Sequence, residues 1–215
     1  MVVAPKNILM LVGSKPIDDV GRVIAQAGIC SFGSDGKPRV GLIYFDSADA
    51  ERMFTDGRMY SVILHEMGHA LGLGTVWGSR GLVSGSFGYT GVRGNEGLAM
   101  LGGSGQARVE DTGGQGTMGA HWKESVYIDE LMTGWAQPAP QLMPLSKLTI
   151  KALEDLGFVV DVGRADSYTL PSLGRRLRKA VAPSDEILGC EVLKLDFSLV
   201  ETNEKKNPRT RKARG

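Results

Sequence analysis

Cysteine is scarce in this chain: Cys30 and Cys190 are the only two among 215 residues. Two cysteines so far apart do not form the disulfide framework that holds small secreted domains together. We expect one of them to be a buried thiol and the other a peripheral one, and a bond between them is the alternative. Disulfide-rich scaffolds are therefore excluded.

Long hydrophobic runs are also missing. No window has the roughly 18 continuous apolar residues that a membrane span requires. Met1–Val12 is too short, and wrongly flanked, to be a signal peptide, and Asn7–Val12 instead reads as a buried strand. The sequence predicts no membrane span, and it leaves the localisation open.

Neither sign of charge dominates. The 25 basic and 24 acidic residues leave a net charge of +1, which indicates nothing about partners. A hydrophobic content of 42% with 23% charged residues is that of an ordinary soluble globular protein. The length suffices for one sizeable domain or for two lobes around a cleft. Glycine is the exception, since its 30 residues are about twice the usual share.

Only three histidines are present, and two of them begin and end the pentapeptide HEMGH at 65–69. On a helix this spacing places His65 and His69 on one face, where both imidazoles can bind one zinc ion at about 2 Å. Glu66 is turned by about 100° from His65, where it can take a proton from a zinc-bound water. Two ordinary core or surface histidines on an amphipathic helix are the alternative explanation of the pentapeptide alone.

The remainder of this helix is predicted to pack. We expect it to begin near Arg58 and to end at Gly72 and Gly74, as helices do at left-handed C-terminal caps. Its opposite face is apolar and should point to the core while the histidines face a cleft. The apolar residues are Ile63, Leu64, Met67, Ala70 and Leu71.

Strand and turn signals precede the helix. In chain order they are an irregular strand or short helix at Val20–Ile29, a turn at Ser34–Pro38, a strand at Val40–Phe45 and a short helix at Asp46–Phe54. Asp46 or Ser47 is the expected cap of that short helix. This order predicts an α+β fold in which a small mixed sheet packs against the helix of the two histidines.

Glycine concentrates between Gly72 and Gly119, where it provides 16 of 48 residues. Helical and strand periodicity are both lost there, apart from an apolar run at Leu98–Leu101. Loops of this length are uncommon in compact domains and are usually functional or disordered. Large apolar residues such as Trp77 and Tyr89 recur through the segment, which favours a packed loop over a flexible linker.

A catalytic zinc takes three protein ligands and keeps a fourth position open for water. Since the pentapeptide supplies two, the third is expected from His121, the one histidine that remains. Glycines before His121 allow the backbone to turn sharply and to carry the imidazole to the metal from a loop. Glu124 and Glu130 are the alternative third ligands.

A further helix is predicted near the end of the apolar part of the chain. Ser146 is its expected N-cap and Gly157 its stop, with Leu145 and Ile150 spaced as a hydrophobic staple. Its buried side should consist of Leu148, Ala152, Leu153 and Leu156.

Several long motifs carry a resemblance to a known family. They are ILHEMGHALGLGTVWG (63–78), VEDTGGQGTMGAHWKES (109–125), ELMTG (130–134) and PLSKLTIKALEDLGFVVD (144–161), supported by GRVIAQAGIC (21–30) and GLIYFDSAD (41–49). From about Ile8 to Leu170 the sequence resembles the leishmanolysin-type metallopeptidases, a branch of the metzincin clan. The resemblance implies a metzincin-like zincin fold, with a small mixed sheet and the active-site helix above a glycine-rich, loop-dominated lower lobe that has a C-terminal helix.

The resemblance also implies the metal ligands and the base. His65, His69 and His121 match the three zinc ligands, and Glu66 matches the general base. Most metzincins place the third histidine six positions after the second, which is Thr75 here, whereas His121 lies 52 positions after His69. A long insertion at this point is typical of the leishmanolysin branch.

Supporting roles follow in the same way. Gly72 matches the glycine at which the chain turns beneath the metal, and Met132 matches the methionine of the Met-turn, an apolar floor under the zinc. We expect substrate to lie extended along an edge strand, for which Gly41–Phe45 is the candidate by the family's architecture. Tyr127 and Trp135 are weak candidates for stabilising the oxyanion.

The domain prediction follows the resemblance. Residues 1–173 form the metallopeptidase catalytic domain, with an upper lobe at 1–74 and a lower lobe at 75–173, and 174–215 form a basic, partly disordered extension. Related catalytic domains carry a further strand and a long helix upstream, so we interpret the upper lobe as N-terminally truncated. Within the extension, Ile187–Val200 is expected to add a strand or a short helix.

The sequence thus predicts a zinc-dependent endopeptidase that acts on protein or peptide substrates. The alternative is a catalytically impaired relative that binds zinc or peptide without cleavage, which the short N-terminal part favours and the presence of Glu66 disfavours. Nucleic-acid binding by the basic runs 174–179 and 203–215 is a third hypothesis, although such runs are more often solvated tails. Family resemblance alone suggests an extracellular or cell-surface location, and the oligomeric state stays open.

Overall fold

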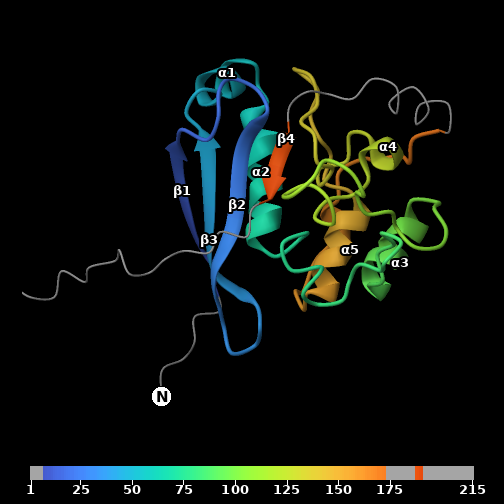
Figure 1. The fold of residues 1–215 in the computed structure, drawn as a ribbon. Helices are drawn as coiled ribbons and strands as arrows, with labels where there is room; N and C mark the ends of the chain where they lie inside the picture. Colours follow the sequence, from blue (N-terminus) through green and yellow to red (C-terminus); the bar gives the residue numbers. More distant parts are fainter. Residues whose placement is uncertain (1–6, 173–186, 191–215) are drawn as a thin grey trace, which may run out of the picture.

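A computed structural model describes residues 7–172 and 187–190 of the chain (Figure 1). Its strands are β1 (Leu9–Lys15), β2 (Val23–Phe32), β3 (Pro38–Asp46) and β4 (Ile187–Cys190). They form one mixed sheet in the order β1-β3-β2-β4, in which β2 and β3 are antiparallel and the two other pairs are parallel. The predicted α+β class with a small mixed sheet is confirmed.

β2 and β3 form a hairpin around the predicted turn at Ser34–Pro38. For Val20–Ile29 the sequence allowed either a strand or a short helix. Most of this segment belongs to the strand β2, which begins at Val23 and continues to Phe32. Ile24 and Ala25 point to opposite faces of β2, and both are fully buried. This strand is therefore covered on both sides.

β1 lies at one edge of the sheet, and the prediction that Asn7–Val12 is a buried strand is wrong. Leu9, Leu11 and Val12 are 56%, 46% and 61% exposed. β1 also continues beyond Val12 to Lys15, because its ladder with β3 continues to the pair of Lys15 and Asp46. An apolar run indicates a strand but does not show how many of its faces the tertiary structure covers.

β3 is a central strand, so the prediction that Gly41–Phe45 is the substrate-binding edge is wrong. Leu42 pairs with Leu11 of β1 on one side and with Gly28 of β2 on the other. The backbone N–H and C=O groups of β3 are engaged in both ladders. The edges of the described sheet are β1 and β4 instead.

Two helices, α1 (Ala50–Thr55) and α2 (Met59–Ala70), follow β3. α2 begins where the sequence predicts, whereas α1 is shorter than predicted. Its N-cap is Asp49, not Asp46 or Ser47. The carboxylate of Asp46 accepts hydrogen bonds from the backbone N–H groups of Asp18 and Ala48, so it organises the loop before α1.

α2 packs against β2 and β3 on one side and against the second half of the chain on the other (Figure 1). Gly41 in β3 allows close approach, since a Cβ there would lie only 2.7 Å from the Cβ of Ala70. His65 and Glu66 are fully buried, whereas Ile63 on the apolar side is 37% exposed. Leu64, Met67 and Ala70 pack against the core as predicted. Only the expectation that the histidine side faces an open cleft is wrong, because that side is fully buried.

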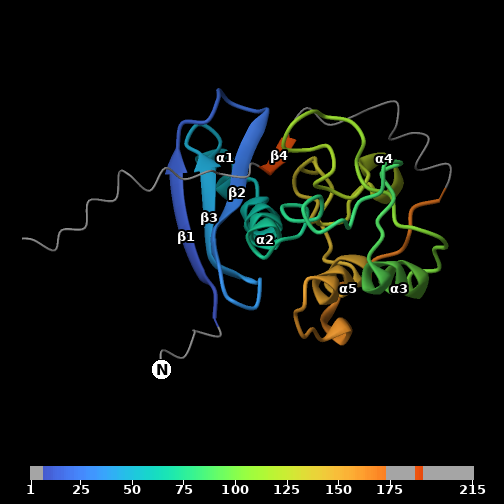
Figure 2. The same ribbon diagram turned by 60° about the horizontal axis from the view of Figure 1, so that its bottom comes forward.

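The second half of the chain consists mainly of loops around an aromatic cluster. Its helices are α3 (Val92–Met100), α4 (Glu124–Tyr127), α5 (Lys147–Asp155) and the 3-10 turn η1 (Val162–Arg164). The rings of Trp77, Tyr89 and Trp122 are fully buried, with centroids 4.4 to 5.1 Å apart. The flexible-linker alternative for 72–119 is therefore wrong, and α3, which the sequence pattern did not reveal, packs beside α5 (Figures 1 and 2).

α5 confirms the helix predicted after Ser146. The Ser146 hydroxyl oxygen accepts a hydrogen bond from the backbone N–H of Thr149, and Gly157 ends the helix at a φ of +87°. Leu148 and Ala152 on its inner side are fully buried. Local signals were sufficient for this helix because its cap and its stop both lie within its own sequence.

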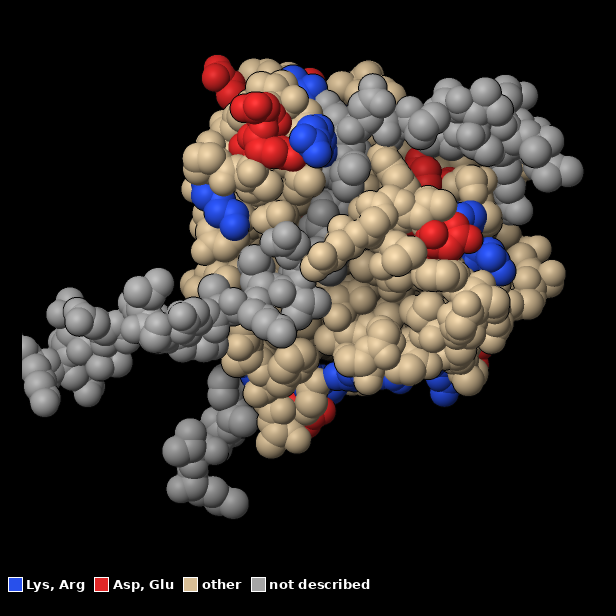
Figure 3. Space-filling model, viewed as in Figure 1, with Lys and Arg blue, Asp and Glu red and all other residues tan. Residues whose placement is uncertain are grey.

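On the face shown in Figure 3, acidic side chains gather near α1, and basic side chains are scattered. The basic runs at 174–179 and 203–215 lie outside the described residues, and of 187–200 the structure describes only β4. Cys30 carries a free, half-buried thiol and forms no disulfide. Among the described helices, none combines the length and the apolar character that a membrane crossing needs.

Candidate metal centre

Three imidazoles from two distant parts of the chain converge on one point. The Nε2 atom of His121 lies 3.2 Å from that of His65 and 3.0 Å from that of His69. All three side chains are fully buried. α2 supplies two of the rings, and the loop before α4 supplies the third, so the structure brings together the three histidines that the sequence singles out.

A backbone carbonyl holds the other nitrogen of each ring. The acceptors of the Nδ1 atoms are the oxygen of Leu131 for His65 (2.6 Å), of Leu73 for His69 (2.8 Å) and of Thr117 for His121 (3.1 Å). A carbonyl oxygen can only accept, so each Nδ1 carries the proton and each Nε2 keeps a lone pair. Histidines that bind metals are commonly oriented by a partner of this kind on the other nitrogen.

The donor set fits a zinc ion. A tetrahedral zinc with bonds of about 2.0–2.1 Å holds its nitrogen ligands about 3.3–3.4 Å apart, close to the observed separations. Three facing lone pairs repel one another unless a cation lies between them. A proton does not fill this role readily, because burial and the neighbouring imidazoles lower the pKa of all three rings, that of His121 to about 3.

Glu66 follows His65 on α2 and is fully buried beside the cluster. Within the described part of the chain, neither of its carboxylate oxygens has a hydrogen-bond partner. Burial raises the pKa of this carboxyl well above its usual range, because an ionised carboxylate without donors is poorly stabilised there. An unsatisfied acid next to three convergent imidazoles is typical of a catalytic proton carrier.

The backbone of Trp122 positions the neighbouring His121. Trp122 forms bridges with Val109 on one side and with Thr133 on the other. Its indole N–H also donates to the hydroxyl of Thr149 in α5, at 2.8 Å. The loop that carries the third imidazole is thus attached to three separate segments.

Glycines leave room for the cluster, and sequence reasoning missed most of this role. Gly74, predicted only as a helix stop, has a φ of +70°, and a Cβ there would collide with the carbonyl group of the residue before His121. A Cβ on Gly68 would lie 2.7 Å from Sδ of Met132, and one on Gly134 would lie 3.4 Å from Cγ of His121. Only the position of these glycines inside the motifs could have suggested their function.

Glu130 anchors the turn that contains Met132. Its Oε2 accepts from the backbone N–H of Met132 at 2.7 Å, and its Oε1 accepts from the hydroxyl groups of Ser146 and Thr149. Met132 is fully buried, with its sulfur against Gly68 of α2. Glu130 is committed to this network and does not belong to the histidine cluster, so it is not the third ligand.

Two other positions lie outside the cluster. Glu124, the second alternative ligand, accepts from the side-chain amide of Gln137 at 3.2 Å and is absent from the group of convergent donors. Thr75, where most metzincins place a histidine, donates its hydroxyl to the backbone oxygen of His69 at 2.8 Å. This threonine closes the turn after α2 and contributes no imidazole.

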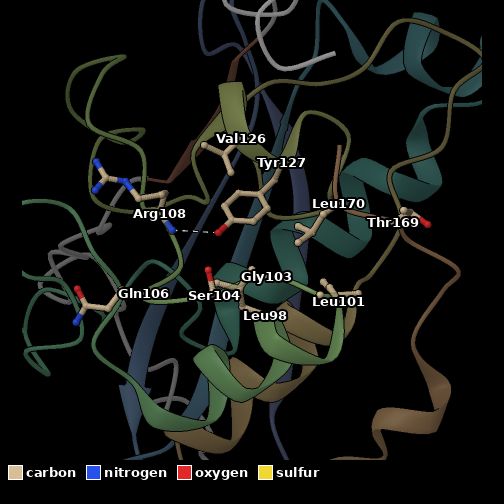
Figure 4. Close-up of a pocket in the computed structure, with 11 residues that line it drawn as sticks. Leu98, Leu101, Gly103, Ser104, Gln106, Arg108, Val126, Tyr127, Thr169 and Leu170 are labelled. Carbon is tan, nitrogen blue, oxygen red and sulfur yellow. Dashed lines mark hydrogen bonds between the residues drawn. The ribbon is translucent and has the colours of Figure 1, made fainter. Parts of the chain in front are cut away.

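The two oxyanion candidates lie in different surroundings. The hydroxyl of Tyr127 accepts from the backbone N–H of Arg108 at 3.0 Å, and its ring lines a cavity of about 530 Å³ (Figure 4). No histidine and no glutamate line this cavity, so Tyr127 belongs to a different site. Trp135 packs beside the loop of His121, since a Cβ on Gly113 would lie 3.4 Å from its ring.

Comparison with known families and proteins agrees with this geometry. The model of a family described as Leishmanolysin, peptidase M8, matches residues 2–80 and 99–170. A leishmanolysin homolog of Crithidia fasciculata is 34% identical over 152 residues, which cover 63% of this chain and 22% of that protein. The leishmanolysin of Leishmania donovani is 33% identical over 169 residues, which cover 71% of this chain and 27% of that protein.

The chain therefore spans about a quarter of the length of these curated relatives. The leishmanolysin of Leishmania major gives the same proportion, with 32% identity over 169 residues and 26% of its length covered. The histidine cluster and Glu66 lie inside the matched ranges, whereas 81–98 and everything after 170 lie outside them.

Proposed function

Since the chain belongs to the leishmanolysin family, we propose that it is a zinc-dependent endopeptidase that holds one zinc ion on His65, His69 and His121. Its substrates would be proteins or peptides. The observation that carries the proposal is the convergence of three imidazole lone pairs beside Glu66, a buried acid without donors among the described residues.

The three histidines would hold the ion without cancelling its charge. When bound, zinc would acidify a water molecule and polarise the carbonyl group of the scissile bond. Neutral imidazoles leave the full charge of the ion available for this, in contrast to thiolate or carboxylate ligands. The Nδ1–H bonds to backbone carbonyls orient the rings in advance, so little rearrangement is required for binding.

Glu66 would carry the proton. As the water oxygen bonds to the carbonyl carbon, a proton of the water passes to a Glu66 oxygen. The C–N bond then breaks, and Glu66 delivers the proton to the leaving amine nitrogen. Its raised pKa suits this task, because the carboxyl must hold the proton between the two steps.

Met132 and Gly72 would support this site. In this proposal Met132 is the apolar floor beneath the histidines of α2, against which its sulfur packs through Gly68. Gly72, at a φ of +109°, is the residue at which the chain leaves α2 and turns.

One observation favours the alternative of a relative that binds zinc or peptide without cleavage. Glu66 and the three histidines are all 0% exposed. A substrate therefore reaches them only after neighbouring chain moves aside. A protein in which this movement does not occur would retain the metal and lack activity.

Metal content and cleavage of casein decide between these functions. We expect one zinc per chain and cleavage that a chelator abolishes. Glu66→Gln should keep the zinc and lower the cleavage rate by about 10²-fold or more, the usual contribution of a general base. The matched control is Glu51→Gln, an exposed glutamate of α1. Cleavage that survives the chelator or Glu66→Gln would refute the mechanism, and bound zinc without cleavage would support the alternative.

A further inference from the structure

β4 stands apart from the other strands of the sheet. Ile187–Cys190 follows the end of the family match at residue 170, whereas β1, β2 and β3 lie within that match. β4 nevertheless completes the sheet by pairing in parallel with β2, with Ala25 opposite Leu188 and Ala27 opposite Cys190. The edge of β2 is therefore closed by a segment outside the part of the chain that the family shares.

This edge is the one beside the histidine helix. α2 contacts β2, β3 and β4, and β1 lies at the far edge of the sheet. Both ribbon views place β4 between β2 and the loops of the second half, which include the loop of His121 (Figures 1 and 2). An extended peptide that reaches the histidine cluster along the sheet would meet the backbone of β2 at this position.

An extended peptide and β4 would pair with the same backbone groups of β2. A free strand edge offers a row of N–H and C=O groups, and an extended peptide binds it by adding one more strand. Along Val23–Ala27, the part of β2 that pairs with β4, the groups that face away from β3 are used by β4 in this structure. A peptide and β4 therefore exclude each other along Val23–Ala27.

β4 has several features that weaken its pairing with β2. Its described part has four residues, and its register with β2 shifts between Val23 and Ala25. Gly189 lies inside it, and glycine weakens a strand because it loses much backbone entropy and packs no side chain. The hairpin of β2 and β3 is longer, so β4 is the weak member of the sheet.

We propose that β4 is an autoinhibitory strand, which occupies the edge of β2 where a peptide substrate adds and must leave before substrate binds. The proposal rests on the proposed peptidase function for its consequence, but the competition itself concerns binding. A test of binding therefore separates the two.

The test uses the full chain with Leu188→Pro, which removes a backbone N–H from β4 and disfavours pairing. Leu188→Val is the matched control, since it keeps strand propensity. The probe is a fluorescein-labelled synthetic peptide with the sequence of residues 185–192 and serine at the cysteine position. We expect the proline variant to bind it at least tenfold more tightly than the wild type and the control, and unlabelled casein to displace it.

Two further measurements keep the test decisive. Amide hydrogen exchange across Val23–Ala27 should accelerate in Leu188→Pro and stay unchanged in Leu188→Val. Casein cleavage by the zinc-loaded proline variant should show a KM several-fold below that of the wild type. If the proline variant does not fold, excess unlabelled peptide added to the wild type should inhibit cleavage competitively.

Equal probe binding by all three proteins, or unchanged exchange in the proline variant, would overturn the proposal. Failure of casein to displace the probe would show that the edge does not bind substrate, which overturns it as well. Absence of chelator-sensitive cleavage in every variant would refute the peptidase function, while probe binding would still decide whether β4 competes for the edge.

Discussion

α2 and the loop of His121 bring imidazoles to the same point by opposite means. On α2 the geometry is local, because residues four apart on any helix share a face. In the loop it depends on partners far along the chain, such as the bridges of Trp122 to Val109 and Thr133. The comparison teaches that the third ligand depends on the folding of the whole second half, whereas the first two depend mainly on one helix.

Gly74→Ala should have the largest effect, because it disturbs the contact between the turn after α2 and the loop of His121. The added Cβ would collide with the carbonyl group before His121, at a backbone φ that L-residues avoid. Strain and overpacking together should lower the free energy of unfolding by about 4 kcal/mol. Urea titration and zinc content measure the effect. Gly78→Ala is the control, since a Cβ at Gly78 meets nothing within 4 Å. A variant as stable as that control would show that the loop adjusts freely.

Glu130→Ala tests whether the second half of the chain also supports the two histidines that α2 carries. The change leaves the donors of Met132, Ser146 and Thr149 without their buried acceptor, which should cost about 3 kcal/mol. Zinc affinity should fall with it, since the neighbouring Leu131 carbonyl orients His65. Glu51→Ala on the surface should change stability by less than about 0.5 kcal/mol. Unchanged zinc affinity would show that Glu130 stabilises the second half of the chain without affecting the metal ligands.

Acid should affect both halves through the histidines. Burial depresses the folded-state pKa of each ring, so its stabilising contribution is present above about pH 6.5 and is lost as the pH falls toward the folded pKa. Each histidine adds a slope of about 1.4 kcal/mol per pH unit in chelator-treated protein. Glu66 and Glu130 oppose this, because burial raises their pKa values and their contribution is lost as the pH rises.

The slope of unfolding free energy against pH, measured by urea titration between pH 6.5 and 4.5, checks this. His121→Asn and His65→Asn should each flatten the slope by about one proton, and Glu66→Gln should steepen it. A slope that no histidine variant changes would contradict the assignment of buried neutral rings.

Ser146→Ala should give the smallest effect. The serine caps α5 by accepting from Thr149 and also donates to Glu130, so the loss of both hydrogen bonds should cost about 2 kcal/mol. The zinc content should stay at the wild-type level, because α5 supplies no ligand. Thermal unfolding measures the loss, and Ser146→Thr, which keeps a hydroxyl that can accept from Thr149 and donate to Glu130, is the matched control.

The parts of the fold that sequence signals predicted are those with local causes. α2, α5 with its Ser146 cap, and the strand after the Ser34–Pro38 turn all carry their signals within a few residues. α3 was missed because glycine disfavours helices, yet here it allows contact: a Cβ on Gly97 would lie 2.5 Å from the backbone oxygen of Lys147. Its stability comes from packing on α5, which no local pattern contains.

The order of the strands could not be predicted from the sequence, for a similar reason. The apolar run at Asn7–Val12 has the composition of a buried strand, and only its position beside β3 makes it an edge. β3 is central because β1 and β2 both pair with it, a choice that depends on the whole sheet. The closing of the β2 edge by Ile187–Cys190 likewise required contact between distant segments.

Residue type and spacing by themselves determined the chemistry available to this protein: two histidines one helical turn apart, a third far away, and a glutamate between the first two. The tertiary structure decided how each acid is used. Glu130 and Glu66 are both fully buried, but donors surround the first and none of the described residues donates to the second. The physical reason is that hydrogen-bond donors come from segments remote in sequence, and only folding determines which carboxylate they reach.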